Sequence, residues 1–435
     1  MKKYNQLIKH SGNAALFDFI ELSILGTLVA QPLHLHAEGL RGTGKTTIIR
    51  ASREILPKIK RIKGCDYNCD PNNPHCPEHK NLTKQEILEI GIEQIDMPFL
   101  EISPSAKKGT VVGSIDLKKL TSKRNPEAAI LLGTIPKAHR GIIFIDEINR
   151  VADMSPEIAD VLLDVMGTKP GKIQIEEVGF SPIIIPAQVS IWAASNPDED
   201  PGPLAEIRRQ LSDRFDFTVN VERPTDPNIV EMILKKQINP FFDGLETKKR
   251  CLFTQVANEI NNFTPSDKIK SLLASIYVDF GLESIRGVEA ILQGVKFKSA
   301  MTNRTSNIND LIFITAHALR HRTDKKNLND ILERLQQLTN KHTDNDVLLK
   351  SEKNIIEDVA KKKNTEIDKR QSLSLFEKLS NYFKNRSQSG GTSSSRNGYS
   401  KHQNAKDTNL NAPPQKALPI SELELKEYVK TDKEL

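Results

Sequence analysis

The sequence is poor in cysteine, has no strong excess of one charge, and contains no long apolar run that is free of charges. Four cysteines in 435 residues are too few for a disulfide scaffold and fit free thiols or metal ligands in a reducing compartment. The formal net charge of +6 is small for this length and falls short of a nucleic-acid-binding signature. The apolar run at residues 17–30 carries Asp18 and Glu21, which argues against a signal peptide or a membrane span. We therefore expect a cytoplasmic protein in which residues 17–30 form a buried helix.

The pattern of apolar residues divides the chain into three parts. Residues 1–222 alternate short apolar runs with helical patterns, which is typical of an α/β domain with a parallel sheet. Residues 223–322 show only helical patterns, and the first begins near Pro227 with Thr225 or Asp226 as its N-cap. Residues 323–435 are polar and predict a mostly disordered tail. The expected strands of the first part are LHLHA (33–37), GIIFID (141–146), VSIWAAS (189–195) and FDFTVNV (215–221).

Two short amphipathic patterns at helical spacing interrupt the tail. Isolated helices of this length are marginal in water, so we expect helices on the surface, and docking of a partner is the alternative. The patterns are Leu328, Ile331, Leu332, Leu335 and Leu338, and Leu375, Phe376, Leu379, Tyr382 and Phe383.

The stretch EGLRGTGKTT follows an expected strand, opens an expected helix, and fits the phosphate-loop pattern G-x-x-x-x-G-K-[ST]. Its glycines let the backbone curl so that N–H groups face phosphate oxygens. Lys45 is expected to reach the β- and γ-phosphates of a nucleotide, and Thr46 to ligate Mg²⁺. His34 and His36, in the strand before the loop, are expected to be packed core residues rather than ligands. The predicted nucleotide-binding residues of the loop are Gly39, Gly42, Thr43, Gly44, Lys45, Thr46 and Thr47.

Two carboxylates, Asp146 and Glu147, end the apolar run GIIFI. Ligands of parallel sheets bind at the C-terminal ends of the strands, so this position suits a nucleotide site. Asp146 can hold Mg²⁺ beside ATP, and Glu147 can polarise the water that attacks the γ-phosphorus. Taken alone, the pair could be an ordinary strand end. After a phosphate loop it predicts ATP hydrolysis.

With these motifs the sequence resembles the AAA+ ATPases, and among them the magnesium-chelatase I-subunit group. The resemblance extends over residues 15–322 and leaves the tail outside. It implies an α/β P-loop core with a parallel sheet, followed by an all-helical lid domain. The stretches that carry it, in the family's order, are EGLRGTGKTT, GCDYNCDP, VVGSIDLKKL, IPKAHRG, IIFIDEIN, IRRQLSDRFDF, SIRGVEAIL and ALRHR.

The resemblance also implies roles for single residues. Asn196 looks like the sensor that aligns the attacking water or the γ-phosphate, and Arg286 looks like the second sensor, which reaches from the lid onto phosphate. Arg214, with Arg208 as the next candidate, occupies the place of the arginine that acts on the neighbouring subunit's nucleotide. This arginine implies a ring, expected to be a hexamer. A hairpin between residues 155 and 185 is expected to face the pore of the ring.

The function that the resemblance implies is an ATP-driven motor that remodels a partner protein. The family's named reaction is insertion of Mg²⁺ into protoporphyrin IX, beside an integrin-like D subunit and a porphyrin-binding H subunit. Related ATPases act with von Willebrand A domain partners. No porphyrin-binding feature is visible in this sequence, so the client stays open.

Two other functions are compatible with the motifs. A nucleic-acid translocase would need a basic hairpin, whereas Lys172 stands there beside Glu176 and Glu177. A nucleotide-dependent scaffold without turnover could dispense with Glu147, Asn196 and Arg214. Both alternatives are therefore less consistent with the sequence than the motor.

Three of the four cysteines lie in the stretch GCDYNCDPNNPHCPEHK. Cys65, Cys69, Cys76 and His79 have the spacing C-x3-C-x6-C-x2-H, and three sulfurs with one nitrogen can complete a tetrahedral zinc site. An ordinary exposed loop is the main alternative, because Asp-Pro-Asn-Asn-Pro forms turns with or without a metal. Redox or iron–sulfur chemistry is a third. In each case we expect a loop that elaborates the ATPase core rather than the place of catalysis.

Overall fold

The computed structural model describes residues 2–115, 130–168, 171–175, 182–235 and 244–338. The amphipathic pattern at residues 375–383 and the rest of the chain beyond residue 338 lie outside these residues. None of the described helices is long and apolar enough to cross a membrane.

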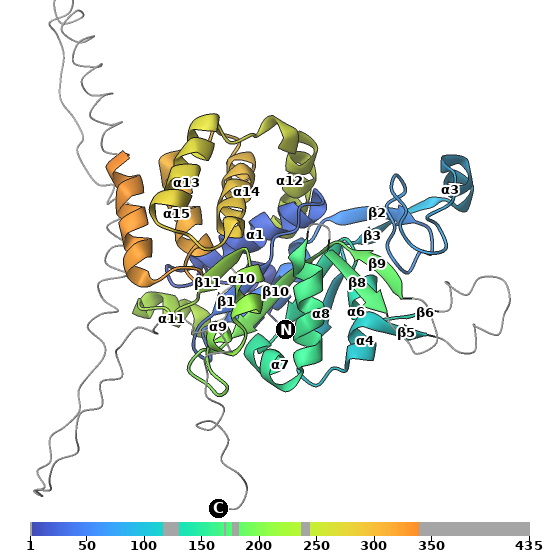
Figure 1. Cartoon of the computed structure of the whole chain (residues 1–435), viewed down its shortest axis with the longest axis horizontal. Helices are drawn as coiled ribbons and strands as arrows, with labels where there is room; N and C mark the ends of the chain where they lie inside the picture. The colour runs from blue at the N-terminus through green and yellow to red at the C-terminus, as the bar shows by residue number, and fades with distance from the viewer. Residues whose placement is uncertain (1, 116–129, 169–170, 176–181, 236–243, 339–435) are drawn as a thin grey trace, which may run out of the picture. The chain divides into compact units, whose positions relative to one another are not determined.

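Five parallel strands form the central sheet, in the order β11-β1-β10-β7-β4 (Figure 1). Each predicted strand is present within a few residues, and the parallel α/β class is confirmed. The fifth strand, β4, was not expected from the sequence. The strands are β1 (Leu35–Glu38), β4 (Phe99–Ile102), β7 (Gly141–Ile145), β10 (Val189–Ser195) and β11 (Phe217–Asn220).

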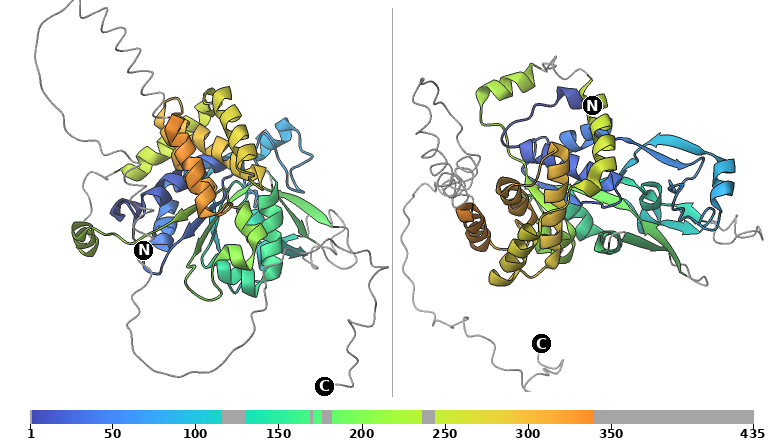
Figure 2. Two further views of the ribbon diagram at one scale, coloured as in Figure 1. Left: turned by 60° about the vertical axis from the view of Figure 1, so that its left-hand side comes forward. Right: turned by 90° about the horizontal axis from the view of Figure 1, so that it is seen from above.

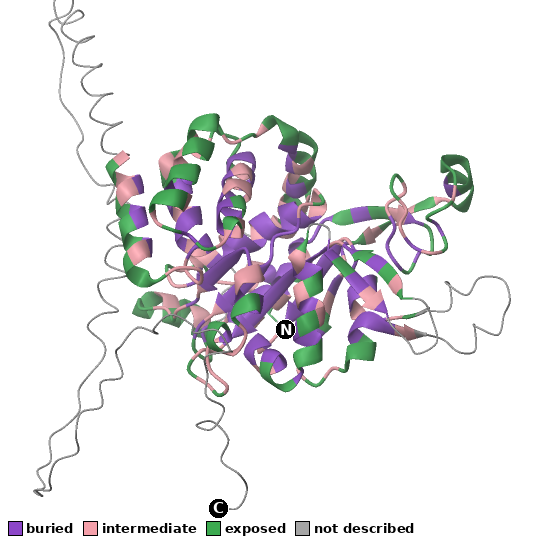
Figure 3. Cartoon of the chain, in the orientation of Figure 1, coloured by how far each residue is buried: buried purple, intermediate pink, exposed green. Residues whose placement is uncertain are grey.

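Both faces of the sheet are apolar, because successive side chains of a strand point to opposite faces. On β7 and β10, one set of alternating residues packs with α1 and the C-terminal helices, and the other packs with α7, α8 and α10. The strands therefore lie at the buried centre of the molecule (Figure 3). The first set is Ile142, Phe144, Trp192 and Ala194, and the second is Ile143, Ile145, Ile191 and Ala193.

Apart from α1 and α8, the helices in the first part of the chain are short. Their bounds are α1 (Ala14–Leu28), α2 (Lys45–Ala51), α3 (Lys84–Ile90), α4 (Lys108–Val112), α6 (Thr134–Lys137), α7 (Ile148–Met154), α8 (Pro156–Gly167), α9 (Leu204–Ile207) and α10 (Arg209–Arg214), with 3-10 turns at Tyr4–Gln6 and Ser52–Ile55.

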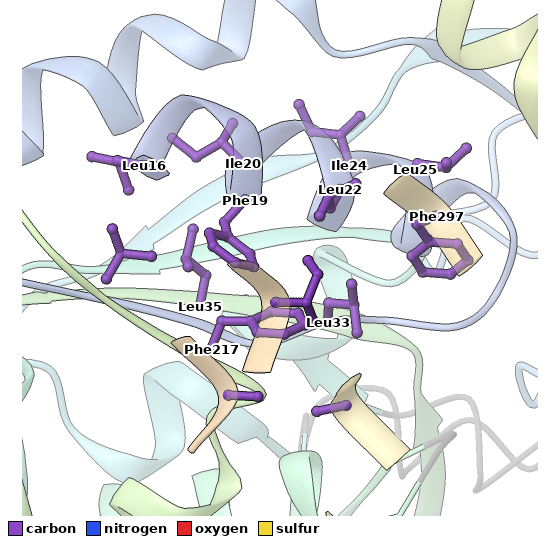
Figure 4. Close-up of a cluster of buried hydrophobic side chains, with 14 of the residues drawn as sticks. Leu16, Phe19, Ile20, Leu22, Ile24, Leu25, Leu33, Leu35, Phe217 and Phe297 are labelled. Carbon is purple, nitrogen blue, oxygen red and sulfur yellow. The ribbon is translucent and has the colours of Figure 1, made fainter. Parts of the chain in front are cut away.

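Helix α1 is the buried helix predicted from the apolar run at residues 17–30. It lies across the sheet, and its side chains interleave with those of β1, β11 and α14 (Figure 4). Phe19, which is fully buried, lies 4.5 Å from Phe217 between ring centroids; truncating such a side chain to alanine costs about 3–5 kcal/mol. The two acidic residues of the run are paired. Asp18 binds Lys9 at 2.7 Å and Lys298 at 3.3 Å, and Glu21 binds Lys249 at 2.7 Å.

Helices α12 (Leu245–Glu259), α13 (Asp267–Asp279), α14 (Ile285–Thr302) and α15 (Ile308–Ala318) gather against α1 as a lid, with a 3-10 turn at Ile260–Asn262 (Figures 1 and 2). The helix before them in the chain, α11 (Pro227–Leu234), has no buried residue and lies apart from this group (Figure 1). Asp226, not Thr225, caps α11, since its carboxylate accepts from the Asn228 amide at 2.9 Å.

A further helix at residues 325–338 follows α15, so the helical part continues beyond the boundary predicted at residue 322. Leu328, Ile331, Leu332 and Leu335 are buried in the same apolar cluster as the lid helices. This first tail pattern is therefore part of a packed core rather than a marginal helix on the surface.

Within the described ranges, three antiparallel strand pairs extend the core. The predicted hairpin after α8 is present, with Ile173 and Ile185 buried and Lys172 and Ile184 exposed. The other two pairs were not predicted. The pairs are β2 (Lys58–Ile62) with β3 (Ile92–Asp96), β5 (Gly113–Ile115) with β6 (Ile130–Leu132), and β8 (Gly171–Ile175) with β9 (Ile183–Ala187).

Candidate active site

Three neighbouring strands deliver the phosphate loop, Asp146, Glu147 and Asn196 to one pocket. The phosphate loop follows β1, Asn196 follows β10, and Asp146 and Glu147 follow β7; β10 lies between the other two strands. Since the strands are parallel, all three C-terminal ends meet at one edge of the sheet. The pocket there has a volume of about 280 Å³. It is lined by Arg41, Gly42, Gly44, Lys45, Thr46, Thr47, Asp146, Glu147, Ser195, Asn196 and Glu199.

The phosphate loop needs glycine at two positions that line the pocket. Gly42 (φ +75°) and Gly44 (φ +90°) adopt left-handed conformations, which L side chains rarely take up. A Cβ on Gly42 would meet no protein atom within 4 Å. The space above Gly42 is therefore open to a ligand, as close approach of phosphate to the backbone requires.

The Lys45 ammonium lies inside the loop. It donates to the carbonyl oxygens of Gly39 and Leu40, the latter at 2.8 Å, and the side chain is buried. Burial lowers the pKa of Lys45, while Asp146 and Glu199 act in the opposite direction. Thr43, whose hydroxyl donates to the Leu40 carbonyl at 2.9 Å, closes the base of the loop. A phosphate in the pocket would give this buried cation a counter-charge.

Thr46 and Asp146 bring two oxygen ligands together. The Thr46 hydroxyl donates to Asp146 Oδ1 at 3.2 Å, although the two residues belong to α2 and the end of β7. Arg50 lies 3.6 Å from the other carboxylate oxygen of Asp146 and is itself held by Glu101 at 2.9 Å. Hydroxyl and carboxylate oxygens are hard ligands that suit Mg²⁺. The residues present therefore fit the metal that accompanies ATP.

Glu147 stands at the turn from β7 into α7 in a left-handed conformation (φ 55°, ψ 51°). Such backbone conformations are unfavourable for a non-glycine residue and often occur at functional sites. The turn places the carboxylate in the lining of the pocket next to that of Asp146. Arg150, one turn along α7, pairs with Glu147 Oε2 at 3.2 Å, and both side chains are about half exposed.

Glu199 and Arg41 are pocket residues that sequence reasoning missed. Glu199 accepts from the Asn196 side-chain amide and from Arg41 Nη2, the latter at 2.9 Å. Asn149 on α7 donates to the Asn196 carbonyl oxygen at 3.4 Å. Asn196 is thus held on both its backbone and its side chain. The only signal in the sequence was an acidic residue three positions after Asn196, in a turn rich in Pro and Asp.

His34 and His36 are packed core residues, as predicted. The His36 ring lies 2.9 Å from the Ser195 hydroxyl, and His34 accepts a hydrogen bond from the Ile191 amide at 3.1 Å. Burial lowers the pKa of His36. The two rings connect β1 and the residue just before it to β10 by buried polar contacts.

Arg214 and Arg286 do not line the phosphate pocket. Both line a second cavity, of about 570 Å³, between α8 and α10 of the core and α13 and α14 of the lid. Burial lowers the pKa of Arg214, and the nearby Arg286 acts in the same direction. Arg208, the second candidate for the finger, pairs instead with Asp160 on α8 at 3.1 Å. Within one chain, the predicted catalytic residues therefore form two separate groups.

Asp213 connects the second cavity to the lid. Its carboxylate accepts from Arg322 at 3.0 Å and lies 3.4 Å from Arg286. Arg322 also donates to the carbonyl oxygens of Asp213 and Phe215, at 2.6 and 2.8 Å. The lid is thereby fixed to the end of α10, directly beside Arg214.

The structure brings Cys65, Cys69, Cys76 and His79 together in one buried cluster. Hydrogen bonds to Cys65 from Cys69 and Cys76 lower the pKa of the Cys65 thiol, and the bond to Cys65 raises the pKa of Cys69 to about 11. The expectation of an ordinary exposed loop is therefore wrong for these four side chains, although residues between them, such as Asn72 and Asn73, are exposed.

The chain has a parallel five-stranded sheet and a helical lid. A phosphate loop follows β1, an Asp–Glu pair follows β7, and Asn196 follows β10. This combination defines an AAA+ P-loop ATPase. No family model matches the chain. Among curated proteins, it is 29% identical to the magnesium-chelatase 38 kDa subunit of Acidiphilium rubrum, over 68% of this chain and 85% of that protein.

Two further relatives are each 28% identical to the chain. The magnesium-chelatase subunit ChlI of Synechocystis is matched over 73% of this chain and 86% of its own length. The ChlI homolog of Methanocaldococcus jannaschii is matched over 69% and 82%. The comparisons thus support the resemblance indicated by the motifs: the curated relatives are magnesium-chelatase I subunits, and the fold and the pocket are those of an ATP-hydrolysing enzyme of the AAA+ type.

Two solved structures overlap with the chain more loosely. One describes the complex between subunits BchI and BchD of magnesium chelatase, at 24% identity and a TM-score of 0.42, covering 76% of this chain and 98% of that one. The other is a putative ATPase from Cytophaga hutchinsonii, at 16% identity and a TM-score of 0.47, covering 77% and 91%.

Proposed function

We propose that the chain is the ATPase subunit of a chelatase-type complex, in which a ring of copies couples ATP hydrolysis to remodelling of a partner protein. The phosphate loop binds the nucleotide, Thr46 and Asp146 hold Mg²⁺, and Glu147 acts as the base. Asn196, oriented by Glu199, aligns the attacking water or the γ-phosphate. The single observation that carries the proposal is the convergence of these residues from three adjacent strands in one pocket.

In this mechanism the residues of the pocket either stabilise the negative charge of the phosphates or accept a proton from the attacking water. Mg²⁺, when bound, neutralises charge on the β- and γ-phosphate oxygens. The Lys45 ammonium binds the same phosphate oxygens. Its side chain is buried and donates to the carbonyl oxygen of Leu40 in the loop. The Glu147 carboxylate accepts a proton from the attacking water, and must leave its ion pair with Arg150 to do so.

Arg214 and Arg286 complete the site of a neighbouring subunit. They lie in a cavity apart from the phosphate pocket of their own chain, with Lys270 and Lys296 nearby. A guanidinium can stabilise the transition state only where it touches the transferred phosphoryl group. We therefore assign both arginines to the nucleotide of the adjacent copy in a ring, which we propose to be a hexamer.

The partner is proposed to carry a von Willebrand A domain, on the strength of the family resemblance. Curated relatives are named magnesium-chelatase subunits, which supports a role in metal insertion for a complex that contains this chain. The β8–β9 hairpin, with Lys172 and Ile184 exposed, is the proposed contact with the remodelled protein. Free cysteines are consistent with a cytoplasmic location.

The ring proposal is tested by mixing two inactive variants. Lys45→Ala lacks the phosphate-binding amine but retains both arginines, while Arg214→Ala retains its phosphate pocket. Each alone should lose ATP turnover by a factor on the order of 10³. In a mixed ring, a Lys45→Ala subunit supplies Arg214 to the intact phosphate pocket of a neighbouring Arg214→Ala subunit. Mixing should therefore restore part of the activity. Mixing Lys45→Ala with Arg286→Ala should do the same.

The control is Arg208→Ala, which should keep its turnover because Arg208 pairs with Asp160 away from both cavities. If neither mixture exceeds the sum of its components, the assignment of the arginines to a neighbour is refuted. The partner is tested with Glu147→Gln held with ATP. A copurifying von Willebrand A domain protein supports the complex, whereas ATP-dependent binding to DNA at physiological salt would favour a translocase.

A further inference from the structure

The loop between β2 and α3 brings four metal-ligating side chains to one point. The ligand atoms of Cys65, Cys69, Cys76 and His79 all lie within 4.8 Å of one another. In a tetrahedral zinc site with Zn–S bonds of about 2.3 Å, ligand atoms are separated by roughly 3.8 Å. The four atoms therefore need only small shifts to enclose an ion. All four residues are at most 8% exposed, so the cluster is shielded from solvent.

Two tight turns bring the ligands together. In the first, the Asn68 amide donates to the Cys65 carbonyl at 3.1 Å, and Asn68 adopts a left-handed conformation (φ 50°). In the second, the His79 and Lys80 amides donate to the Cys76 carbonyl at 3.1 and 2.9 Å. The sequence spacings C-x3-C and C-x2-H thus correspond to two turns that face each other.

Two backbone amides orient the sulfur of Cys69. The amides of His75 and Cys76 both donate to Cys69 Sγ, each at 3.3 Å. Hydrogen-bond partners of this kind orient the ligands of protein metal sites.

His79, rather than His75, completes the group of converging ligand atoms. His79 Nδ1 lies 2.9 Å from Cys76 Sγ and belongs to the converging set. The His75 ring stacks on His139 with centroids 3.8 Å apart, and its Nδ1 lies 3.3 Å from Cys69 Sγ. His75 is therefore placed to support a ligand rather than to be one.

We propose that Cys65, Cys69, Cys76 and His79 bind one Zn²⁺ ion in a closed, structural site. Three sulfurs and one imidazole nitrogen form a ligand set that selects zinc over the hard cations Mg²⁺ and Ca²⁺. Because the protein supplies all four ligands, no coordination position is left for a water or a substrate. The site is thus separate from ATP turnover.

The ion would fix the start of β7. The Asn68 side-chain amide donates to the Lys137 carbonyl at 2.7 Å. Arg140 donates to the Lys60 carbonyl at 2.6 Å and pairs with Asp70 at 3.1 Å. These contacts attach the cysteine loop to the residues just before β7, and Asp146 follows the other end of that strand. The main effect of zinc loss should therefore be a lower stability of the chain, and the direct effect on the phosphate pocket should be small.

The test is the metal content of the full-length, tag-free protein purified with a reductant. Elemental analysis should give about one Zn per chain. Cys76→Ser and His79→Ala should each contain far less zinc, and each should melt at a lower temperature. The control Cys251→Ser, which removes the exposed cysteine of α12, should retain the metal.

A second measurement does not depend on the folding of the variants. Native protein treated with a chelator and reloaded with Co²⁺ should show thiolate-to-cobalt charge transfer and the strong visible bands of tetrahedral cobalt. Three results would overturn the zinc site: no zinc in the native protein even after incubation with Zn²⁺ and reductant, equal zinc loss in Cys251→Ser and Cys76→Ser, or a disulfide among the three loop cysteines in freshly purified metal-free protein.

Discussion

The hydroxyl of Thr46 donates a hydrogen bond to Asp146 Oδ1 across 3.2 Å, which joins the first turn of α2 to the end of β7. Each residue offers one oxygen to the same point of the phosphate pocket. An Mg²⁺ ion that accompanies ATP can be ligated by the hydroxyl and lie close enough to the carboxylate for a contact through water.

Thr46→Val removes the hydroxyl and keeps the shape of the side chain. We expect the Mg²⁺ concentration that gives half-maximal ATP turnover to rise about tenfold or more, which corresponds to about 1.4 kcal/mol. Thr46→Ser keeps the oxygen and should stay near the native value. Turnover measured across a magnesium titration distinguishes them. An unchanged requirement in Thr46→Val would contradict the assignment of Thr46 as a metal ligand.

Two glycines of the phosphate loop should respond differently to alanine. A Cβ on Gly39 would lie 2.2 Å from the Val221 carbonyl oxygen, so Gly39→Ala should lower the free energy of unfolding by about 1–3 kcal/mol or more. Gly42 has open space above it, so Gly42→Ala should lower the free energy of unfolding by only about 1–2 kcal/mol, the cost of a left-handed conformation for alanine. Its main effect should be weaker ATP binding. Urea denaturation and nucleotide titration of both variants check this contrast.

Most of the phosphate pocket could be predicted from the sequence, because its residues belong to local motifs. The glycines, Lys45 and Thr46 are consecutive, and Asp146 with Glu147 directly follows an apolar strand. Neither Glu199 nor Arg41 could be assigned in this way, since their role depends on a contact between two loops.

Other features could not be predicted because they depend on contacts between segments that are far apart in the sequence. Strand β4 is only four residues long and carries Glu101, so its pattern is weak until it pairs with β7. The helix at residues 325–338 looked marginal, since its burial depends on the lid against which it packs. Spacing alone could not show that Cys65 and His79 converge, nor that Arg286 lies apart from the phosphate pocket.

Arg322 should be essential for the attachment of the lid to the core. Its buried side chain pairs with Asp213 and donates to the carbonyl oxygens of Asp213 and Phe215. Arg322→Ala leaves these acceptors without their donor, so the free energy of unfolding should fall by about 3–5 kcal/mol. The matched control is Arg209→Ala, which breaks another pair between core and lid. Arg209 and Glu283 are 75% and 73% exposed, and their pair should contribute less than about 1 kcal/mol.

Chemical denaturation of the two arginine variants provides the comparison. Equal losses in Arg322→Ala and Arg209→Ala would show that the buried pair has no special role in holding the lid.

Glu199 should act as a positioning residue for Asn196. Its carboxylate accepts from the Asn196 amide and from Arg41. In Glu199→Ala we expect turnover to fall about tenfold, a loss typical of a misplaced polar group, with a smaller change in ATP affinity. Asp198→Ala, on the exposed part of the same turn, should be near native. Turnover and affinity should be measured separately, because a purely structural role would impair both and lower the melting temperature.

The central claim is that the pocket hydrolyses ATP with Glu147 as the base. Steady-state ATP turnover of the native protein and of Glu147→Gln, with nucleotide affinity measured in parallel, tests it most directly. The substitution keeps the size of the side chain but removes its capacity to accept a proton, so turnover should fall at least about 100-fold while ATP still binds. Equal turnover in the two proteins would contradict the claim.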